Sequence, residues 1–499
     1  ITMTIQHNND QETKHNFIAG EWRNSSNHIQ NINPSDTNDV IASYAIATKD
    51  DVQDAVSAAT SALPAWSSST SGERFDILDA IGTEIIQRKE ELGDLLAREE
   101  GKTLKEAVAE AHRAGSLFKF FAAEVYRSDT EGYRSLREGV SLQVQREPIG
   151  VVAAITPWNF PLAIPAWKIA PALAYGNTVV FKPSELVCGS AWALAEIISR
   201  AGLPDGVFNL LMGQGSETGA AIVEHPNVAG VTFTGSSDIG RKIGASVFAR
   251  GGKIQLEMGG KNPLIVLDDA DLDKAVEYAI NGAFFSCGQR CTASSRLIVT
   301  ENIHDSFVDA MLKRMELLRI GNARNPKTDI GPVVSEAQLK KNLEYIRVGL
   351  NDGAKHLTGG LQVEQETPGW YLSPALFTGA KSEMKICREE IFGPIAAVMS
   401  VSDYDEALSI ANDTEFGLSA GIVTNDRSII DHFIANINSG MVQINLPTAG
   451  MDFHAPITGR KNSSFGPPEK SSYCREFFTN TKVVHANYGK RLNSKKEES

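Results

Sequence analysis

The sequence predicts an α/β protein, because short apolar runs alternate with segments long enough to form helices. The first series of apolar runs covers residues 151–155, 178–181, 208–212 and 231–233. A second series follows Lys261, at residues 264–267, 297–299, 395–399, 420–423 and 441–444. Such alternation is typical of a parallel, doubly wound sheet. We therefore expect two α/β domains, with residues 257–291 at their junction.

Helical patterns dominate the first 126 residues. Thr48 and Asp51 suit the cap and first turn of a helix with one apolar face, and we expect this helix to end at Pro64. Apolar residues recur near helical spacing over residues 73–126, which predicts further long helices. The glycines at residues 213–215 are interpreted as a loop.

Two predicted strands stand outside both series. Residues 140–145 alternate strictly between apolar and polar side chains, which indicates a half-buried strand. A closing strand at residues 477–484 has few local partners. We expect both strands to form an arm that pairs with another subunit, followed by a charged, disordered tail at residues 490–499.

Composition narrows the class of protein. The net charge of −13 disfavours nucleic acid as a partner. No apolar run approaches the roughly 18 residues that span a bilayer, and the polar residues 6–10 lack the pattern of a signal peptide. Five scattered cysteines argue against a disulfide framework, so we expect a cytoplasmic protein that binds no membrane.

Cys291 is the most informative residue, because a Glu-Met-Gly-Gly-Lys motif at residues 257–261 stands upstream of it. A thiol attacks a carbonyl carbon, and a carboxylate such as Glu257 activates the water that later releases the product. Taken singly, Cys291 is a buried structural cysteine and Glu257 a solvated carboxylate. The two motifs together favour covalent catalysis.

Cys287 lies four residues before Cys291, a spacing that permits oxidative pairing or metal capture. No cluster of His or Cys completes a metal site, so we expect no metal.

A proline-fenced turn with Thr156, Trp158 and Asn159 follows a predicted strand. Ligands of open α/β sheets bind at that end of the strands. The Asn159 amide can donate a hydrogen bond to a developing oxyanion, and the alternative is an ordinary turn asparagine.

Three further motifs suit a dinucleotide. Lys182, Ser184 and Glu185 end the next strand, where lysine and glutamate can hold ribose hydroxyls or form a surface ion pair. Residues 233–240 follow another strand and open a helix whose N-terminus can face a phosphate. Residues 389–394 place two carboxylates before an aromatic ring, which suits either a ribose contact or a plain helix end.

Together and in this order, the motifs resemble those of the aldehyde dehydrogenase superfamily over nearly the whole chain, from residues 16–22 to the C-terminal strand. The resemblance implies oxidation of a small-molecule aldehyde to an acid with NAD or NADP. It implies a Rossmann-like parallel-sheet cofactor domain, a second α/β catalytic domain and a small β oligomerisation arm, in a homodimer or homotetramer. The implied boundaries are 1–126 and 149–260 for the NAD(P)-binding domain, 261–466 for the catalytic domain, and 127–148 and 467–499 for the arm and tail.

The resemblance also implies roles for single residues. Cys291 resembles the nucleophile and Glu257 the general base, while Asn159 resembles the oxyanion donor together with the backbone N–H of Cys291. The positions that resemble cofactor contacts are Thr156, Trp158, Lys182, Ser184, Glu185, Gly235, Ser236, Gly240, Glu390 and Phe392.

Substrate and cofactor are less closely defined. Residues 288–293 and 452–461 are most similar to the 2-oxoglutarate (alpha-ketoglutaric) semialdehyde branch, although Ile457 and Thr458 replace its usual Phe-Gly. Arg290 suits an acidic substrate or, equally, an internal ion pair. A Glu185 carboxylate accepts from a ribose hydroxyl and repels a 2′-phosphate, which favours NAD, while Lys182 keeps NADP open.

Alternative functions remain open at this point. Other aldehydes are succinic semialdehyde, betaine aldehyde and aliphatic aldehydes. A coenzyme A-acylating reaction would pass the acyl group to a thiol, which Glu257 disfavours because activated water would consume the thioester. A binding protein without activity is disfavoured by the joint presence of Cys291, Glu257 and Asn159.

Overall fold

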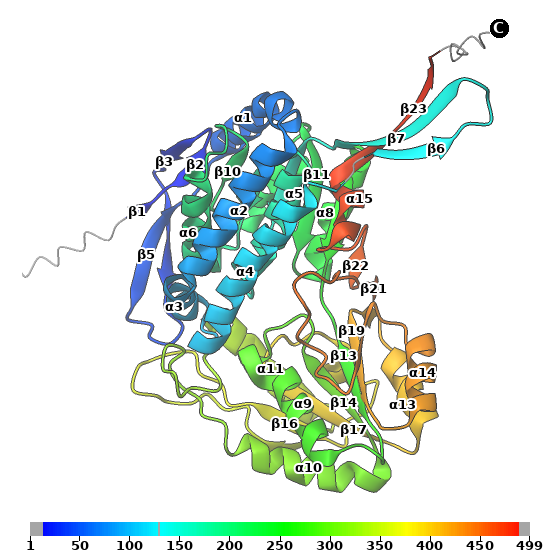
Figure 1. Cartoon of the computed structure of the whole chain (residues 1–499). Helices are drawn as coiled ribbons and strands as arrows, with labels where there is room; N and C mark the ends of the chain where they lie inside the picture. Colours follow the sequence, from blue (N-terminus) through cyan, green and yellow to red (C-terminus); the bar gives the residue numbers. More distant parts are fainter. Residues whose placement is uncertain (1–12, 128–129, 489–499) are drawn as a thin grey trace, which may run out of the picture.

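The computed structural model of the chain describes residues 13–127 and 130–488, and the α/β prediction is confirmed. An eight-stranded sheet lies in the upper lobe and a seven-stranded sheet in the lower lobe (Figure 1). Residues 6–10 and the predicted tail at residues 490–499 lie outside the described residues. Within the described part, no helix combines the length and the apolar character needed to cross a bilayer.

The eight-stranded sheet has the order β22-β12-β11-β8-β9-β10-β2-β3. Its parallel strands are β8 (Val151–Ile155), β9 (Thr178–Lys182), β10 (Phe208–Leu210), β11 (Val228–Thr234) and β12 (Lys253–Glu257). Antiparallel strands close its edges: β22 (Ser464–Phe465), β2 (Asn16–Ile18) and β3 (Glu21–Arg23). β12 was not predicted, because it carries only two apolar side chains, Ile254 and Leu256.

Helices cover both faces of this sheet. Val151, Ala153 and Ile155 of β8 belong to one apolar core, and Val152 and Ala154 belong to the other. The first core is completed by α1 (Lys49–Ser67), α7 (Ala220–Glu224) and α8 (Ser237–Ala249). The second is completed by α2 (Ser71–Gln87), α3 (Lys89–Glu100), α4 (Leu104–Glu124), α5 (Ala163–Ala174) and α6 (Cys188–Ser199). Because successive strand residues face opposite sides, the sheet is doubly wound as predicted.

The prediction that the first helix ends at Pro64 is wrong. α1 continues through Pro64 to Ser67, since a proline in the last turn removes only one backbone hydrogen bond. Burial of Trp66 stabilises this last turn, and the Ser67 and Ser68 hydroxyls donate to the Pro64 carbonyl. The loop expected at residues 213–215 also differs, because Gly215–Gly219 form a π-helical turn.

The seven-stranded sheet has the order β15-β16-β17-β14-β13-β19-β20. Six strands are parallel: β13 (Asn262–Val266), β14 (Ser294–Thr300), β16 (Ala375–Thr378), β17 (Ile395–Val401), β19 (Ser419–Val423) and β20 (Met441–Ile444). The antiparallel edge strand is β15 (Lys355–Thr358). β15 and β16 were not predicted. The helices packed against this sheet are α9 (Leu272–Phe284), α10 (Glu301–Met315), α11 (Glu336–Asn351), α12 (Lys385–Arg388), α13 (Tyr404–Asn412) and α14 (Arg427–Asn436).

A three-stranded sheet projects from the upper lobe (Figure 1). Its order is β23-β7-β6, formed by β6 (Thr130–Arg134), β7 (Val140–Pro148) and β23 (Thr479–Asn487). The two strands predicted for the arm therefore pair with each other. The closing strand starts at Thr479 rather than residue 477, because Phe477 and Phe478 end the short helix α15 (Arg475–Phe478) and are buried in the core.

Small elements complete the chain. β1 (Thr13–Lys14), β5 (Val40–Ala45) and β4 (His28–Ile32) form a second three-stranded sheet, and β18 (Phe416–Gly417) pairs with β21 (Arg460–Lys461). The predicted domain boundaries stay a prediction. β22, which they assign to the catalytic domain, adds a strand to the eight-stranded sheet.

Candidate active site

Four parallel strands of the eight-stranded sheet end side by side. Ile155 of β8 pairs with Lys182 of β9 and with Phe233 of β11, and Thr234 pairs with Glu257 of β12. The turn after β8, the loop after β11 and Glu257 therefore emerge at one edge. This is the edge at which open α/β sheets bind ligands.

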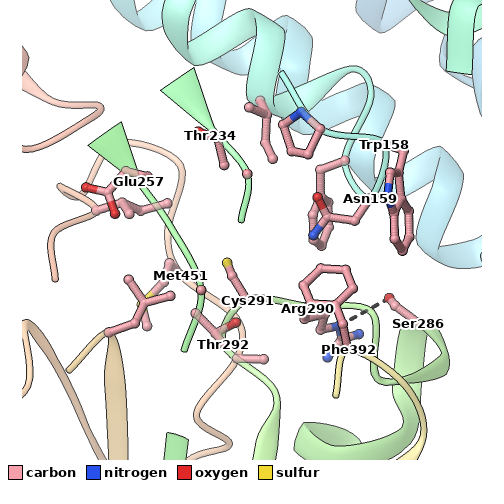
Figure 2. A pocket seen from close by; sticks show the side chains of 18 of the residues that line it. Trp158, Asn159, Thr234, Glu257, Ser286, Arg290, Cys291, Thr292, Phe392 and Met451 are labelled. Atoms are coloured by element: carbon pink, nitrogen blue, oxygen red, sulfur yellow. Dashed lines mark hydrogen bonds between the residues drawn. The ribbon is translucent and has the colours of Figure 1, made fainter. Parts of the chain in front are cut away.

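A cavity of about 600 Å³ opens at this edge. Its walls come from both lobes: residues 157–160, 234–236 and 257–259 lie on one side, and residues 286, 290–292, 390 and 392 on the other. In Figure 2 the Cys291 sulfur points into the open space, with Glu257 to one side and Asn159 to the other. The structure thus brings together three residues that are far apart in the sequence.

Cys291 lies in the loop between α9 and β14. Ser286 and Cys287 have positive φ angles of 52° and 55°, so the chain reverses sharply before Cys291. Gly288 is required next, because a Cβ there would lie 2.2 Å from the Gly393 carbonyl oxygen. Burial raises the pKa of the Cys291 thiol to about 12, and the Glu390 and Glu257 carboxylates add to that rise.

Glu257 is the last residue of β12 and is buried. The Ser464 hydroxyl donates a hydrogen bond of 2.5 Å to its Oε2. Burial raises the pKa of Glu257 well above its ordinary value, and the Glu469 carboxylate adds to the rise, while Ser464 and Lys168 oppose it. A carboxyl in this environment suits a general base that works near neutral pH.

Asn159 is held from two sides. The side-chain Nδ2 of Asn159 donates to the Gln289 backbone carbonyl at 3.1 Å, and the backbone carbonyl of Asn159 accepts from Lys102 Nζ at 2.6 Å. Gln289 precedes Cys291 by two residues, so the Asn159 amide lies next to the loop of the thiol. The second N–H of that side-chain amide can donate to the oxygen of a substrate bonded to Cys291.

The predicted cofactor residues fall into two groups. Trp158, Gly235, Ser236, Glu390 and Phe392 line the same cavity as Cys291. The Trp158 and Phe392 rings meet edge to face at 5.2 Å, and Glu390 Oε1 accepts from the Gly260 N–H at 3.0 Å.

The other group lies along the same sheet edge but does not line the cavity. Lys182 Nζ lies 3.6 Å from Glu185 Oε2, the Ser184 hydroxyl accepts from Leu186 N, and Thr156 is buried after β8. A Cβ at Gly240 would lie 2.5 Å from Met258 Sδ, so this glycine lets α8 approach the sheet closely.

Buried hydroxyls without a hydrogen-bond partner lie along this edge of the eight-stranded sheet. The hydroxyls of Thr156, Thr234 and Ser237 are buried and have no hydrogen-bond partner in the described part of the chain. Buried polar groups are normally paired, so these three fit a polar ligand such as a dinucleotide. Sequence reasoning missed Thr234 and Ser237, although both flank the predicted residues 235 and 236.

Arg290 forms the internal ion pair that was the alternative to a substrate contact. Its Nη2 lies 3.0 Å from Glu106 Oε1, and its Nη1 donates to Asn281. Its Nε donates to the Ser286 hydroxyl (Figure 2). The guanidinium lines the cavity with four of its five N–H donors engaged by Ser286, Asn281 and Glu106.

Besides Arg290 and Lys341, the cations Arg113 and Lys470 line the cavity. Sequence reasoning missed them, because neither belongs to a motif. Arg113 stands at helical spacing from Glu106 and Glu110, and that spacing was the only available signal. Among the described residues, no group of three His, Cys, Asp or Glu side chains is arranged to hold a metal ion.

A thiol that faces a buried carboxylate across a cavity, on a doubly wound sheet, defines the class of enzyme that works through a covalent cysteine adduct. The family model described as "Aldehyde dehydrogenase family" matches residues 22–484. The chain therefore belongs to the aldehyde dehydrogenase family, which confirms the resemblance read from the motifs, and it is an oxidoreductase of that kind.

Individual relatives agree with this assignment. Alpha-ketoglutaric semialdehyde dehydrogenase from Bacillus subtilis strain 168 is 43% identical over 479 residues, which are 95% of this chain and 98% of the relative. 2,5-dioxopentanoate dehydrogenase from Saccharolobus solfataricus is 40% identical over 472 residues, covering 94% and 98%. The NAD+ complex of betaine aldehyde dehydrogenase from Staphylococcus aureus has a TM-score of 0.93 and 33% identity, covering 96% of each chain.

Proposed function

We propose that this protein oxidises an acidic semialdehyde, 2-oxoglutarate semialdehyde, to the dicarboxylic acid with NAD(P). The observation that carries the proposal is the cavity in which Cys291 faces Glu257 and Asn159. The names of the Bacillus and Saccharolobus relatives support the choice of substrate.

The first step is attack by the Cys291 thiolate, which forms when the thiol loses its proton to solvent water. The sulfur bonds to the aldehyde carbon as the C=O π bond breaks, and the carbonyl oxygen becomes an oxyanion. The Asn159 amide and the Cys291 backbone N–H donate to that oxygen. Loss of one such donor lowers the rate by about 100- to 1,000-fold in comparable sites.

The residues present fit a dinucleotide. Trp158, Ser236, Glu390 and Phe392 would hold its nicotinamide half in the cavity, and Lys182 with Glu185 would hold its adenosine ribose. When bound, the dinucleotide supplies a nicotinamide ring that accepts hydride from the tetrahedral carbon. The Glu185 carboxylate favours NAD over NADP, and the related Staphylococcus enzyme was solved with NAD+.

The second step is hydrolysis of the thioester left on Cys291. Glu257 takes a proton from water, the hydroxide adds to the acyl carbon, and the acid leaves as the thiolate returns. Glu257 lines the cavity, so water that it activates can reach the thioester there. We therefore expect water rather than coenzyme A to accept the acyl group.

A panel of aldehydes tests the proposal. Purified protein is assayed for NADH and NADPH formation with 2-oxoglutarate semialdehyde, succinic semialdehyde, betaine aldehyde, glycolaldehyde and pentanal. The acidic semialdehydes should show the highest kcat/KM, and the acid should form without coenzyme A. Cys291→Ala should abolish turnover and retain dinucleotide binding. Equal kcat/KM across the panel, or turnover by Cys291→Ala, would contradict the proposal.

Assembly and location belong to the same proposal. The projecting sheet supports a homodimer or homotetramer, because β6 and β23 are its outermost strands among the described residues and a strand of another subunit can be added beside them. The five free cysteines support a reducing compartment, and we propose the cytoplasm.

A further inference from the structure

The cations that line the cavity differ in whether a carboxylate lies beside them. Arg290 is paired with Glu106 at 3.0 Å, and Lys341 lies beside Glu390, where its charge acts on the Glu390 carboxylate.

Arg113 and Lys470 have no carboxylate within ion-pair distance in the described part of the chain. Glu110, another carboxylate of the lining, is already paired with the buried Lys102 at 2.7 Å. Arg113 and Lys470 therefore bring to the cavity two cations without an ion-pair partner.

Lys470 is a buried cation, with 1% of its surface exposed. Its ammonium donates to the Asp452 carbonyl at 3.0 Å and lies 5.4 Å from the Trp167 ring centre. An ammonium has three donors, so two remain for a ligand. Burial of a charge with so few partners is costly.

Arg113 lies close enough to Lys470 to act on its charge. Burial lowers the pKa of Lys470 to about 8, and the nearby Arg113 guanidinium lowers it further, while Glu469, Asp452 and Cys291 oppose the shift. Two like charges that face one cavity repel each other. An anion between them would remove that repulsion.

We propose that Arg113 and Lys470 bind the distal carboxylate of the substrate, the group farthest from the reacting aldehyde. This inference rests on the proposed oxidation of an acidic semialdehyde. Arg113 presents a planar fork that matches a carboxylate, and Lys470 adds a point charge. The charge of Arg290 is already paired with Glu106, so we assign the carboxylate to Arg113 and Lys470 instead.

The rest of the cavity fits a short carbon chain between the two ends. Phe160, Ile164, Trp167 and Ile457 line it with apolar surface. The aldehyde carbon then lies at Cys291 while the carboxylate lies at the two cations. A trimethylammonium substrate would place positive charge beside Arg113 and Lys470, so the site disfavours betaine aldehyde.

The test compares matched acidic and neutral aldehydes. Wild type, Arg113→Met and Arg113→Lys are assayed with 2-oxoglutarate semialdehyde and with pentanal, which has the same number of carbons and no carboxylate. Arg113→Met should lower kcat/KM for the acidic substrate by about 10- to 100-fold, mainly through KM. Its kcat/KM for pentanal should change by less than about threefold, and Arg113→Lys should recover part of the loss.

Lys105→Met is the matched control. It removes one positive charge from the same helix at an exposed residue outside the cavity, so both substrates should keep wild-type kinetics. Lys470→Met should resemble Arg113→Met. If a thermal melt shows that Lys470→Met does not fold, the kinetics of Arg113→Met alone test the inference.

A binding measurement does not depend on turnover. 2-Oxoglutarate should protect Cys291 from iodoacetamide in wild type and protect it far less in Arg113→Met. If wild type prefers the acidic aldehyde and Arg113→Met keeps both preference and protection, this inference is overturned and the proposed function stands. If wild type itself shows no preference for the acidic aldehyde, the proposed substrate fails.

Discussion

Glu257 is placed where its negative charge is unfavourable. It is buried, and the Glu469 carboxylate acts on it through the protein interior, so its pKa lies well above the ordinary 4.5. Only the ionised form accepts a proton from water. The rate of thioester hydrolysis should therefore rise with pH as Glu257 ionises, through an apparent pKa well above 4.5.

Replacement of Glu257 separates the two steps of the reaction. Glu257→Gln keeps the shape of the side chain and removes the base, so hydrolysis should slow by about 100- to 10,000-fold. In stopped-flow absorbance, the first turnover should still release one NADH per active site before the slow phase. Glu224→Gln, at an exposed end of α7, should match wild type. An unchanged steady-state rate for Glu257→Gln would remove its role as base.

The resting thiol of Cys291 should be protonated at neutral pH. Burial and the charges of Glu390 and Glu257 raise its pKa to about 12. Because only the thiolate reacts, the alkylation rate with iodoacetamide should rise about tenfold for each pH unit from 7 to 9. Cys188, Cys287, Cys387 and Cys474 are buried and should not interfere.

Glu390→Gln removes the charge with the larger effect on this thiol. In Glu390→Gln without dinucleotide, alkylation of Cys291 at pH 8 should be faster than in wild type, because the pKa of the thiol falls. Glu389→Gln, the exposed neighbour, should leave the rate unchanged. A plateau in the wild-type rate below pH 9 would show that the pKa is not raised.

At the scale of elements, helix α4 and the residues just before it position Asn159, the proposed oxyanion donor. Lys102 Nζ contacts both Glu110 Oε2 and the Asn159 carbonyl, at 2.7 and 2.6 Å. Glu110 Oε1 accepts from the first N–H groups of α5, those of Leu162 and Ala163. One buried ion pair thus connects α4, the Asn159 turn and α5.

Lys102→Met should weaken both stability and catalysis. Breaking a buried pair costs about 3 to 5 kcal/mol of unfolding free energy, because Glu110 is left uncompensated. The Asn159 turn loses an anchor, so kcat should fall while KM for the dinucleotide changes little. Lys119→Met is the control: its pair with Asp79 on α2 is 39% exposed on each side, and its loss should cost at most about 1 kcal/mol. Denaturant unfolding and steady-state kinetics check both variants, and equal losses would contradict the anchoring role.

Sequence reasoning singled out Cys291, Glu257 and Asn159 because each stands in a recognisable motif. Glu257 is the last residue of one parallel strand and Asn159 lies in the turn after another, and the ends of such strands meet at one edge whatever the loops between them. Arg290 shows the limit of this reasoning. Its partner Glu106 is 184 residues away on α4, and no local pattern records that contact. Arg113 and Lys470 were missed for the same reason, since only the packed fold brings α4 and the loop after Glu469 to one cavity.

At the scale of the whole molecule, the projecting sheet is the part least covered by the rest of the chain (Figure 1). It exposes large apolar side chains: Tyr133 and Val483 are each 55% exposed, and Leu136 at the hairpin turn is fully exposed. Apolar surface of this kind, on the outer strands of a small sheet, is typical of an interface between subunits.

Replacement of these apolar residues should therefore change the assembly and not the fold. In light scattering coupled to size exclusion, wild type should have a mass two or four times the chain's 54.0 kDa. Leu136→Asp combined with Val483→Asp should shift the protein towards smaller species, because a charge in an apolar interface is left without water or partner. Leu361→Asp, at a leucine outside the arm that is 69% exposed, should keep the wild-type mass. Circular dichroism should show the same secondary structure in all three proteins. A monomeric wild type, or an unchanged mass for the double variant, would show that the arm does not join subunits.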